Sequence, residues 1–184
     1  ISNGINVKDY NFEETQEAIQ KDLNIPLGNF VIGHVGRFDP AKNHQTILDV
    51  ASLLLSREKK VHFVFCGLGT EKIHSIAKEL QIEKHITVLG FRRDIPRVLK
   101  ALDLFFFPSI TEGQPNALIE AMVSDIPVLA SNIPAIQECV PVVLHSNLYE
   151  PNDVDAFEKA VGRLLDEKGF DKIDIKEEIK TKFD

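Results

Sequence analysis

The sequence predicts an α/β domain whose core is a doubly wound, parallel β-sheet with helices on both faces. From residue 30 onward, short apolar runs alternate with amphipathic segments, which is typical of strands alternating with helices. The runs are continuously apolar rather than alternating with polar residues, as expected for strands buried on both faces. We therefore expect a Rossmann-like sheet, whose ligands lie in the crevice beyond the carboxyl ends of the strands.

Six apolar runs, rich in β-branched and aromatic residues, are the expected strands. They cover residues 30–35, 61–66, 86–89, 102–107, 127–130 and 140–144. Three intervening segments repeat apolar residues at helical spacing and therefore present one apolar face each. These expected helices cover residues 47–55, 73–80 and 157–165.

The strand–helix pattern predicts one α/β domain over residues 30–168. Residues 1–29 are expected to be a lead-in segment from an interdomain linker, with a polar helical stretch from Glu13 to Leu23. Residues 169–184 are strongly charged and are expected to be a truncated carboxy-terminal helical tail. Both ends therefore indicate that the chain is part of a larger protein.

Composition narrows the function. With 21 Lys and Arg against 28 Asp and Glu, the net charge of −7 argues against a general nucleic-acid binder. Cys66 and Cys139 are far apart and lie in or beside apolar stretches, so buried, reduced thiols and a cytoplasmic compartment are expected. The histidines show no ligand spacing, and no metal is expected. Any bound anion must therefore be held by a few well-placed cations and backbone amides.

The loop after the first strand carries two such cations. Arg37 and Lys42 flank a turn at Asp39-Pro40, Gly36 allows close backbone approach, and a helix starts near Gln45. Two cations and a helix N-terminus at the carboxyl end of a strand suit a diphosphate. The alternative, that both are solvated loop charges, stays open from the spacing alone.

A second candidate loop follows the fourth strand. Pro115 is expected as the first residue of a helix, which would leave the amides of Asn116, Ala117 and Leu118 free for an anion.

Two carboxylates accompany this loop. Glu112 lies in the loop, and Glu120 lies eight residues later on the helix. Ionised carboxylates accept hydrogen bonds from sugar hydroxyls, so the pair suits a sugar beside a diphosphate. Equally, Glu112 could be a capping residue and Glu120 a surface charge.

The motifs occur in a specific order over nearly the whole chain, from Asn3-Gly4 to about Leu165. They are Gly36-Arg37-Phe38 with Lys42-Asn43, then Leu89-Gly90-Phe91, then Pro108-Ser109, Glu112-Gly113, Pro115 and Ile119-Glu120-Ala121-Met122. In this combination the sequence resembles the carboxy-terminal, donor-binding domain of family-four retaining glycosyltransferases of the GT-B fold.

The resemblance implies a role for each matching residue. Arg37 and Lys42 would hold the diphosphate of the donor and stabilise the leaving group. Glu112 would face the donor sugar, as a nucleophile or as a stabiliser of an oxocarbenium-like state, and Glu120 would bind the ribose hydroxyls. The remaining donor contacts would be Gly36 and Gly113, Pro115, Asn116, Ala117 and Leu118 around the phosphates, and Gly90, Phe91 and Arg92 along the nucleobase.

The resemblance further implies sugar transfer from a nucleoside diphosphate sugar, without another cofactor, to a glycan or lipid-linked acceptor in bacterial surface polysaccharide synthesis. The partner would be an amino-terminal acceptor domain, through which a membrane-associated acceptor at the inner face of the membrane could be reached. The fragment alone would be inactive. A GT-B sugar-nucleotide epimerase and a non-catalytic nucleotide-sugar-binding module are the alternatives.

The sequence departs from the family pattern at two positions. Asp125 replaces the usual glycine before the fifth strand, and Gln114 stands where an apolar residue is common. Both departures bear on sugar choice and loop shape rather than on the reaction. A basic patch at Arg92, Arg93 and Arg97 is either a solvated face or a second phosphate contact.

Overall fold

The computed structural model describes residues 13–166, which form an α/β domain around one parallel sheet. Within these residues the strand order is β3-β2-β1-β4-β5-β6, and every neighbouring pair is parallel. The strands are β1 (Phe30–Val35), β2 (Val61–Cys66), β3 (Ile86–Gly90), β4 (Leu104–Phe107), β5 (Val128–Ser131) and β6 (Leu148–Tyr149). This is the predicted doubly wound, Rossmann-like arrangement.

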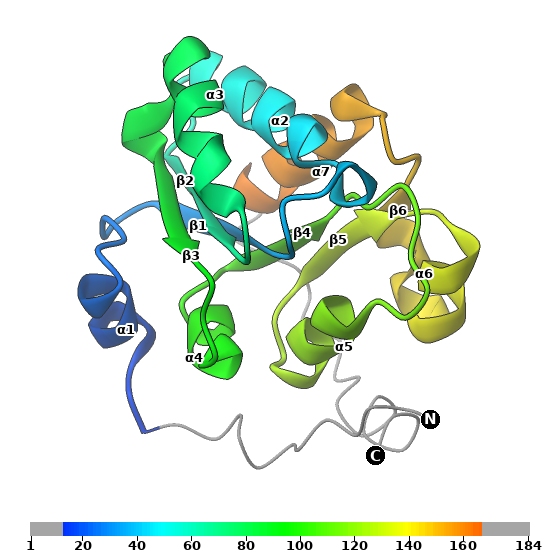
Figure 1. The fold of residues 1–184 in the computed structure, drawn as a ribbon. Helices are drawn as coiled ribbons and strands as arrows, with labels where there is room; N and C mark the ends of the chain where they lie inside the picture. The colour runs from blue at the N-terminus through cyan, green and yellow to red at the C-terminus, as the bar shows by residue number, and fades with distance from the viewer. Residues whose placement is uncertain (1–12, 167–184) are drawn as a thin grey trace.

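Helices cover both faces of the sheet (Figure 1). One face carries α2 (His44–Ser56), α3 (Ile73–Glu79) and α7 (Val154–Asp166). The other carries α1 (Gln16–Asp22), α4 (Ile95–Lys100), α5 (Asn116–Val123) and α6 (Pro134–Cys139). In the connections between residues 13 and 166 lie four 3-10 helices, namely η2 (Pro40–Lys42), η3 (Thr70–Lys72), η4 (Glu83–His85) and η5 (Val142–Asn147).

Strand β4 shows why the runs are continuously apolar. Phe105 and Phe107 pack into the cluster under α4, α5 and α6, while Phe106 packs into the cluster under α2 and α7. All three side chains are fully buried. A strand in the middle of a helix-covered sheet has no solvent-facing side, so none of its positions favours a polar residue.

The order of the strands reverses between β1 and β4, and this topological switch point fixes where a ligand can bind. The two strands pair at only two positions, Ile32 with Leu104 and Gly33 with Phe105. The loops that follow β1 and β4 therefore leave the sheet side by side, one towards α2 and the other towards α5.

Five of the predicted strands are confirmed, with ends that move by at most two residues. The sixth, at residues 140–144, is wrong. Val140 is extended, but the chain then enters η5, in which Val142 and Val143 are exposed. Pro141 has no amide hydrogen to donate to a strand ladder, and the sixth strand forms instead at β6, where Leu148 and Tyr149 pair with β5.

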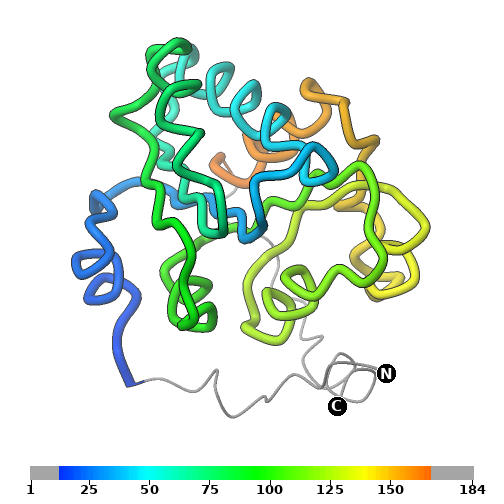
Figure 2. Tube along the Cα trace, viewed as in Figure 1, coloured from blue at the N-terminus to red at the C-terminus, as the bar shows by residue number. Residues whose placement is uncertain are grey.

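The predicted polar helix before the sheet is α1, and it packs on the domain beside α4, as the backbone trace shows (Figure 2). Its Ile19 is fully buried, and the Gln20 side-chain amide donates to the Ala101 carbonyl at 2.8 Å. The described part of the lead-in segment thus shares the core of the domain that follows it.

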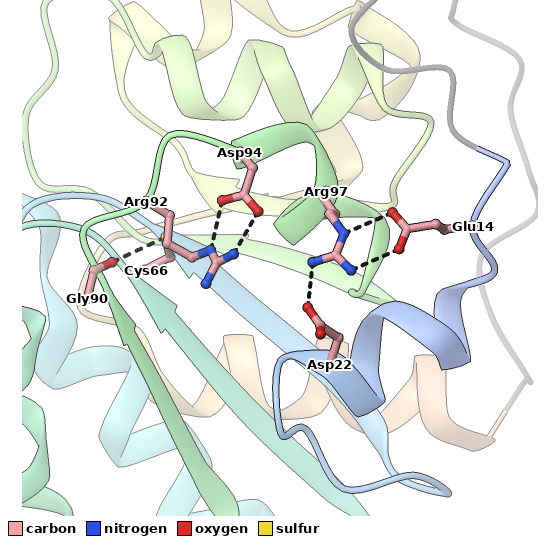
Figure 3. Close-up of polar contacts among 7 residues, drawn as sticks. All are labelled: Glu14, Asp22, Cys66, Gly90, Arg92, Asp94 and Arg97. Atoms are coloured by element: carbon pink, nitrogen blue, oxygen red, sulfur yellow. Dashed lines mark hydrogen bonds and ion pairs between the residues drawn. The ribbon is translucent and has the colours of Figure 1, made fainter.

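Arg97 of α4 binds two acidic residues of this segment (Figure 3). Its guanidinium donates two hydrogen bonds to the Glu14 carboxylate, both 2.9 Å long, and one to Asp22 at 2.8 Å. The hydrogen bonds from Arg97 lower the pKa of the Glu14 carboxyl group, and the positive charge of Arg97 adds to this effect. Arg97 is therefore neither a freely solvated charge nor an available phosphate ligand.

Candidate functional site

The loop after β1 is held against the loop after β2 by main-chain contacts. The Gly36 amide donates to the Cys66 carbonyl at 2.9 Å, and the Phe38 amide donates to the Leu68 carbonyl at 2.8 Å. A β-carbon on Gly67 would collide with the Gly36 carbonyl oxygen, and Gly67 has a φ of +147°. Only glycine permits both this approach and this backbone conformation, so Gly67 allows the loop after β2 to pack directly against the Gly36 turn.

Lys42 and Glu112 meet at the centre of the switch point. The Lys42 ammonium donates to Glu112 Oε1 at 2.6 Å, although the two residues are 70 positions apart. The Glu112 side chain is only 6% exposed and that of Lys42 23%, so the ion pair is largely shielded from water. The same ammonium lies 5.3 Å from the centroid of the Phe107 ring. Two of the three predicted catalytic residues are therefore in direct contact.

Arg37, the third, is not part of this contact. Its side chain is 68% exposed, and its guanidinium lies 3.7 Å from Asp39 in the same loop. An exposed guanidinium on a loop can reach a ligand in the crevice, but nothing in the described structure holds it in a binding geometry.

The start of α5 differs in detail from the prediction. Pro115 is the N-cap of α5 and not its first helical residue. The Asn116 amide donates to the Gln114 carbonyl at 2.9 Å, and the Leu118 amide donates to the Pro115 carbonyl at 3.0 Å. The expectation that three successive amides are free is therefore wrong for these two, because the turn at Pro115 already satisfies them. Gly113 lies in open space, where an added β-carbon would touch nothing.

Glu112 and Glu120 lie in different surroundings. Glu112 is ion-paired, whereas within residues 13–166 the Glu120 carboxylate has no recorded hydrogen-bond or ion-pair partner. Glu120 is half-buried on α5, and burial raises the pKa of its carboxyl group. The Glu120 carboxylate is therefore an available hydrogen-bond acceptor, while Glu112 is already engaged by a cation.

The loop after β3 is tightly organised (Figure 3). The Gly90 carbonyl accepts from the Gly67 amide at 2.8 Å and from the Cys66 thiol at 3.4 Å, and Gly90 has a φ of +65°. Arg92 binds Asp94 through two hydrogen bonds of 2.8 and 2.7 Å, which hold the pKa of Asp94 below its ordinary value. The Phe91 ring is 67% exposed. The loop thus offers an aromatic face, while the Arg92 guanidinium is committed to Asp94.

The sequence assigned no individual role to a group of buried polar residues beside this site. His34 Nδ1 lies 2.9 Å from the Phe106 carbonyl, while His34 Nε2, both ring nitrogens of His44 and the hydroxyl of Ser109 have no hydrogen-bond partner among the described residues. The rings of His34 and His44 are 4.8 Å apart. Local sequence gives no signal for this cluster, because single histidines are equally common as exposed residues.

Burial lowers the pKa of His34 to about 3 and those of His44 and His62 to about 4. Unfolding returns each ring towards its ordinary pKa of 6.5, so the unfolded chain binds more protons between these values. The stabilisation from keeping these rings neutral is complete above about pH 6.5 and is lost as the pH falls.

We therefore expect the free energy of unfolding to fall as the pH is lowered from about 6.5 to about 4. The His44→Phe variant should lose part of this dependence, up to about 1.4 kcal/mol per pH unit for one proton. Denaturant unfolding at a series of pH values measures the slope, and His74→Gln, at an exposed position, is the control. An unchanged slope in His44→Phe would show that His44 does not contribute.

A cavity of about 310 Å³ lies on another part of the β1–α2 connection. It is lined by residues of the connection, α2 and α3, among them Phe38, Leu48 and Ile76, and neither Lys42 nor Glu112 borders it. Asn43 and His44, which follow Lys42, also line it, so the cavity adjoins the Lys42 loop but does not include the Lys42–Glu112 pair.

The described residues contain no group of three or more His, Cys, Asp or Glu side chains arranged to hold a metal ion. Among the helices between residues 13 and 166, none has the length and apolar character needed to span a membrane.

Comparison with known proteins gives a consistent picture. The sequence pattern of the family described as glycosyl transferases group 1 matches residues 15–181. The UDP-Gal:alpha-D-GlcNAc-diphosphoundecaprenol alpha-1,3-galactosyltransferase of Escherichia coli is 32% identical over 154 residues, which are 81% of this chain and 40% of that enzyme.

Solved structures share the fold at lower identity. HepE from Anabaena, in complex with UDP, superimposes with a TM-score of 0.85 at 22% identity, over 99% of this chain and 52% of HepE. WaaG, a glycosyltransferase involved in lipopolysaccharide biosynthesis, gives a TM-score of 0.75 at 17% identity, over 100% of this chain and 49% of WaaG. This chain therefore spans about half the length, or less, of each of these proteins.

The sheet order, the placement of the charged loops at the switch point and the match over residues 15–181 lead to one conclusion. The chain belongs to the glycosyl transferases group 1 family and has the Rossmann-like fold found in GT-B glycosyltransferases.

Proposed function

We propose that this chain is the nucleotide-sugar-binding domain of a retaining glycosyltransferase, which transfers a sugar from a nucleoside diphosphate sugar to a glycan or lipid-linked acceptor in bacterial surface polysaccharide synthesis. The observation that carries the proposal is the shielded Lys42–Glu112 pair at the switch point. One cation and one carboxylate lie together at the switch point, which supports a site where a diphosphate and the sugar attached to it meet.

Charge supports an anionic ligand at this position. The chain carries a net charge of −7, so a diphosphate would be repelled by most of the surface and attracted only where cations are concentrated. Lys42 and Arg37 supply two positive charges on the loop after β1. In the proposal they bind the diphosphate and stabilise the charge that develops on the leaving group.

The remaining proposed donor contacts come from the loop after β4, from helix α5 and from the loop after β3. Glu112 faces the sugar, Glu120 accepts hydrogen bonds from the ribose hydroxyls, and the Phe91 ring lies along the nucleobase. The available carboxylate of Glu120 and the 67% exposed ring of Phe91 support these assignments. Because Arg92 is bound to Asp94, we assign its contribution to the shape of the base-binding loop and not to a charge contact with the donor.

Uridine diphosphate sugars are the proposed donor class. The E. coli relative is named for UDP-Gal, and HepE has been crystallised with UDP and with UDP-glucose. Since the chain spans 40% of the E. coli enzyme, we propose that an amino-terminal acceptor-binding half completes the active site on the cytoplasmic side of the membrane. The chain alone is then inactive in sugar transfer.

Calorimetric titration of the chain with UDP, GDP, ADP and inorganic phosphate tests the proposal. We expect the chain to bind UDP in preference to the other three ligands. The binding should be weak, because the chain lacks the half that would close the crevice. No preference for any nucleoside diphosphate over inorganic phosphate would contradict the proposal, and sugar transfer by the chain alone would contradict the need for a second half.

A further inference from the structure

Asn43, the residue after Lys42, links the two loops that carry the Lys42–Glu112 pair. Its side-chain amide lies 3.1 Å from the carbonyl oxygen of Pro108, in the loop after β4. It also lies 2.8 Å from the Pro151 carbonyl and 3.1 Å from Asn152 Oδ1, between β6 and α7. Asn43 is only 8% exposed, so these contacts are made away from bulk water.

The chemistry of the partners fixes what residue 43 must supply. The Pro108 and Pro151 carbonyls can only accept hydrogen bonds, so the nitrogen of the Asn43 amide has to face them. Asn43 occupies the N-cap position of α2, yet its side chain makes no capping hydrogen bond. Asparagine at this position usually caps its own helix. Here the amide is directed across the switch point instead.

A second cross-link lies on the other side of Lys42. The Ile110 amide donates to the Ala41 carbonyl at 2.8 Å. Lys42 is thus flanked by one residue bonded to Pro108 and another bonded to Ile110, and these two partners lie four and two positions before Glu112. These two cross-links align the backbone of the Lys42 loop with that of the Glu112 loop on both sides of the ion pair.

We infer that Asn43 is a positioning residue, whose side-chain amide holds the Lys42 loop against the Glu112 loop and so sets the geometry of their ion pair. The inference rests on the proposed function in one respect, namely that the pair meets the donor. The contacts of Asn43 form in the chain without a ligand, so the inference about Asn43 and the proposed function can fail separately.

A purely conformational role is the competing explanation. Asn43 has a φ of +54°, in the left-handed region that asparagine and glycine tolerate best. If the backbone alone mattered, Asn43→Gly would be neutral and Asn43→Asp would be mild. If the amide matters, Asn43→Gly loses the cross-link, and Asn43→Asp is worse because its carboxylate faces two carbonyl oxygens and an amide oxygen.

The first measurement needs no nucleotide. Denaturant unfolding of Lys42→Met, Glu112→Gln and the double variant gives the coupling between the two charges, once with Asn43 and once with Asn43→Gly. We expect a clear coupling with Asn43 and less than about half of it with Asn43→Gly. Equal coupling in both backgrounds overturns the inference, whether or not the chain binds a nucleotide.

The second measurement is UDP affinity by calorimetry. We expect Asn43→Gly to weaken UDP binding about 2- to 10-fold, the equivalent of one ordinary hydrogen bond, and Asn43→Asp to weaken it more. Asn24 is the matched control, because it has a φ of 56° but an exposed side chain away from the site. Asn24→Gly and Asn24→Asp should leave UDP affinity unchanged.

The ranking of the Asn43 variants by UDP affinity decides between the positioning role and the purely conformational role. UDP affinity in Asn43→Gly equal to that of the unmodified chain, with Asn43→Asp also unchanged, supports the conformational role and overturns the inference. Should Asn43→Gly fail to fold, the coupling cycle is repeated in Asn43→Ala, which has no side-chain donor, and an unreduced coupling there overturns the inference equally. If the unmodified chain binds no UDP, the proposed function fails and the coupling cycle still tests Asn43.

Discussion

Glu112→Gln should raise the affinity of the chain for bare UDP and yet lower sugar transfer by about 100- to 1000-fold in a protein that also carries the acceptor-binding half. The ion pair explains the first effect, because Lys42 is engaged by Glu112 at 2.6 Å when no ligand is present. A neutral glutamine releases Lys42 to the diphosphate. The second effect follows because positive charge develops on the sugar only in the transition state, and the variant has no carboxylate to stabilise that charge.

Calorimetry with UDP and steady-state kinetics with a UDP-sugar measure the two effects separately. Glu120→Gln is the control, since its carboxylate has no cation partner in the described structure and is assigned to the ribose. That variant should weaken UDP and UDP-sugar binding alike. If Glu112→Gln weakens bare UDP as much as Glu120→Gln does, Glu112 is not the sugar-facing carboxylate.

Lys42→Met should weaken UDP binding by about 10- to 100-fold, the effect of losing one charge-assisted contact. It should also destabilise the domain, because the Glu112 side chain is 6% exposed and would be left without its cation. Arg37→Ala should lower UDP affinity without loss of stability, since the Arg37 side chain is 68% exposed. Calorimetry and thermal unfolding of the same samples separate binding from folding.

The double variant Lys42→Met with Glu112→Gln distinguishes the two effects of losing Lys42. Replacing the carboxylate with a neutral amide removes the unpaired buried charge, so stability should return towards that of the unmodified chain. UDP affinity should stay low, because the cation is still absent. Recovery of both properties would mean that Lys42 acts on UDP only through folding.

Much of the fold could be predicted because its determinants are local. A strand buried on both faces must be apolar at every position, as in the run Phe105, Phe106 and Phe107, and α2 and α7 must be apolar on one stripe. The sixth strand could not be found in this way. Leu148 and Tyr149 are too few to form a pattern, and they become a strand only by pairing with Ala130 and Ser131.

The sequence by itself determined which loops border the candidate site, because the residues after each apolar run must lie at the carboxyl edge of a parallel sheet. It placed Lys42 after β1 and Glu112 after β4. Only the tertiary structure decided that these two side chains touch, because their contact depends on β1 and β4 being neighbours across 70 residues of intervening chain. For the same reason the partners of Arg97 and Asn43 emerge only from the fold: each is chosen by the three-dimensional neighbours of the side chain and leaves no periodic trace in the sequence.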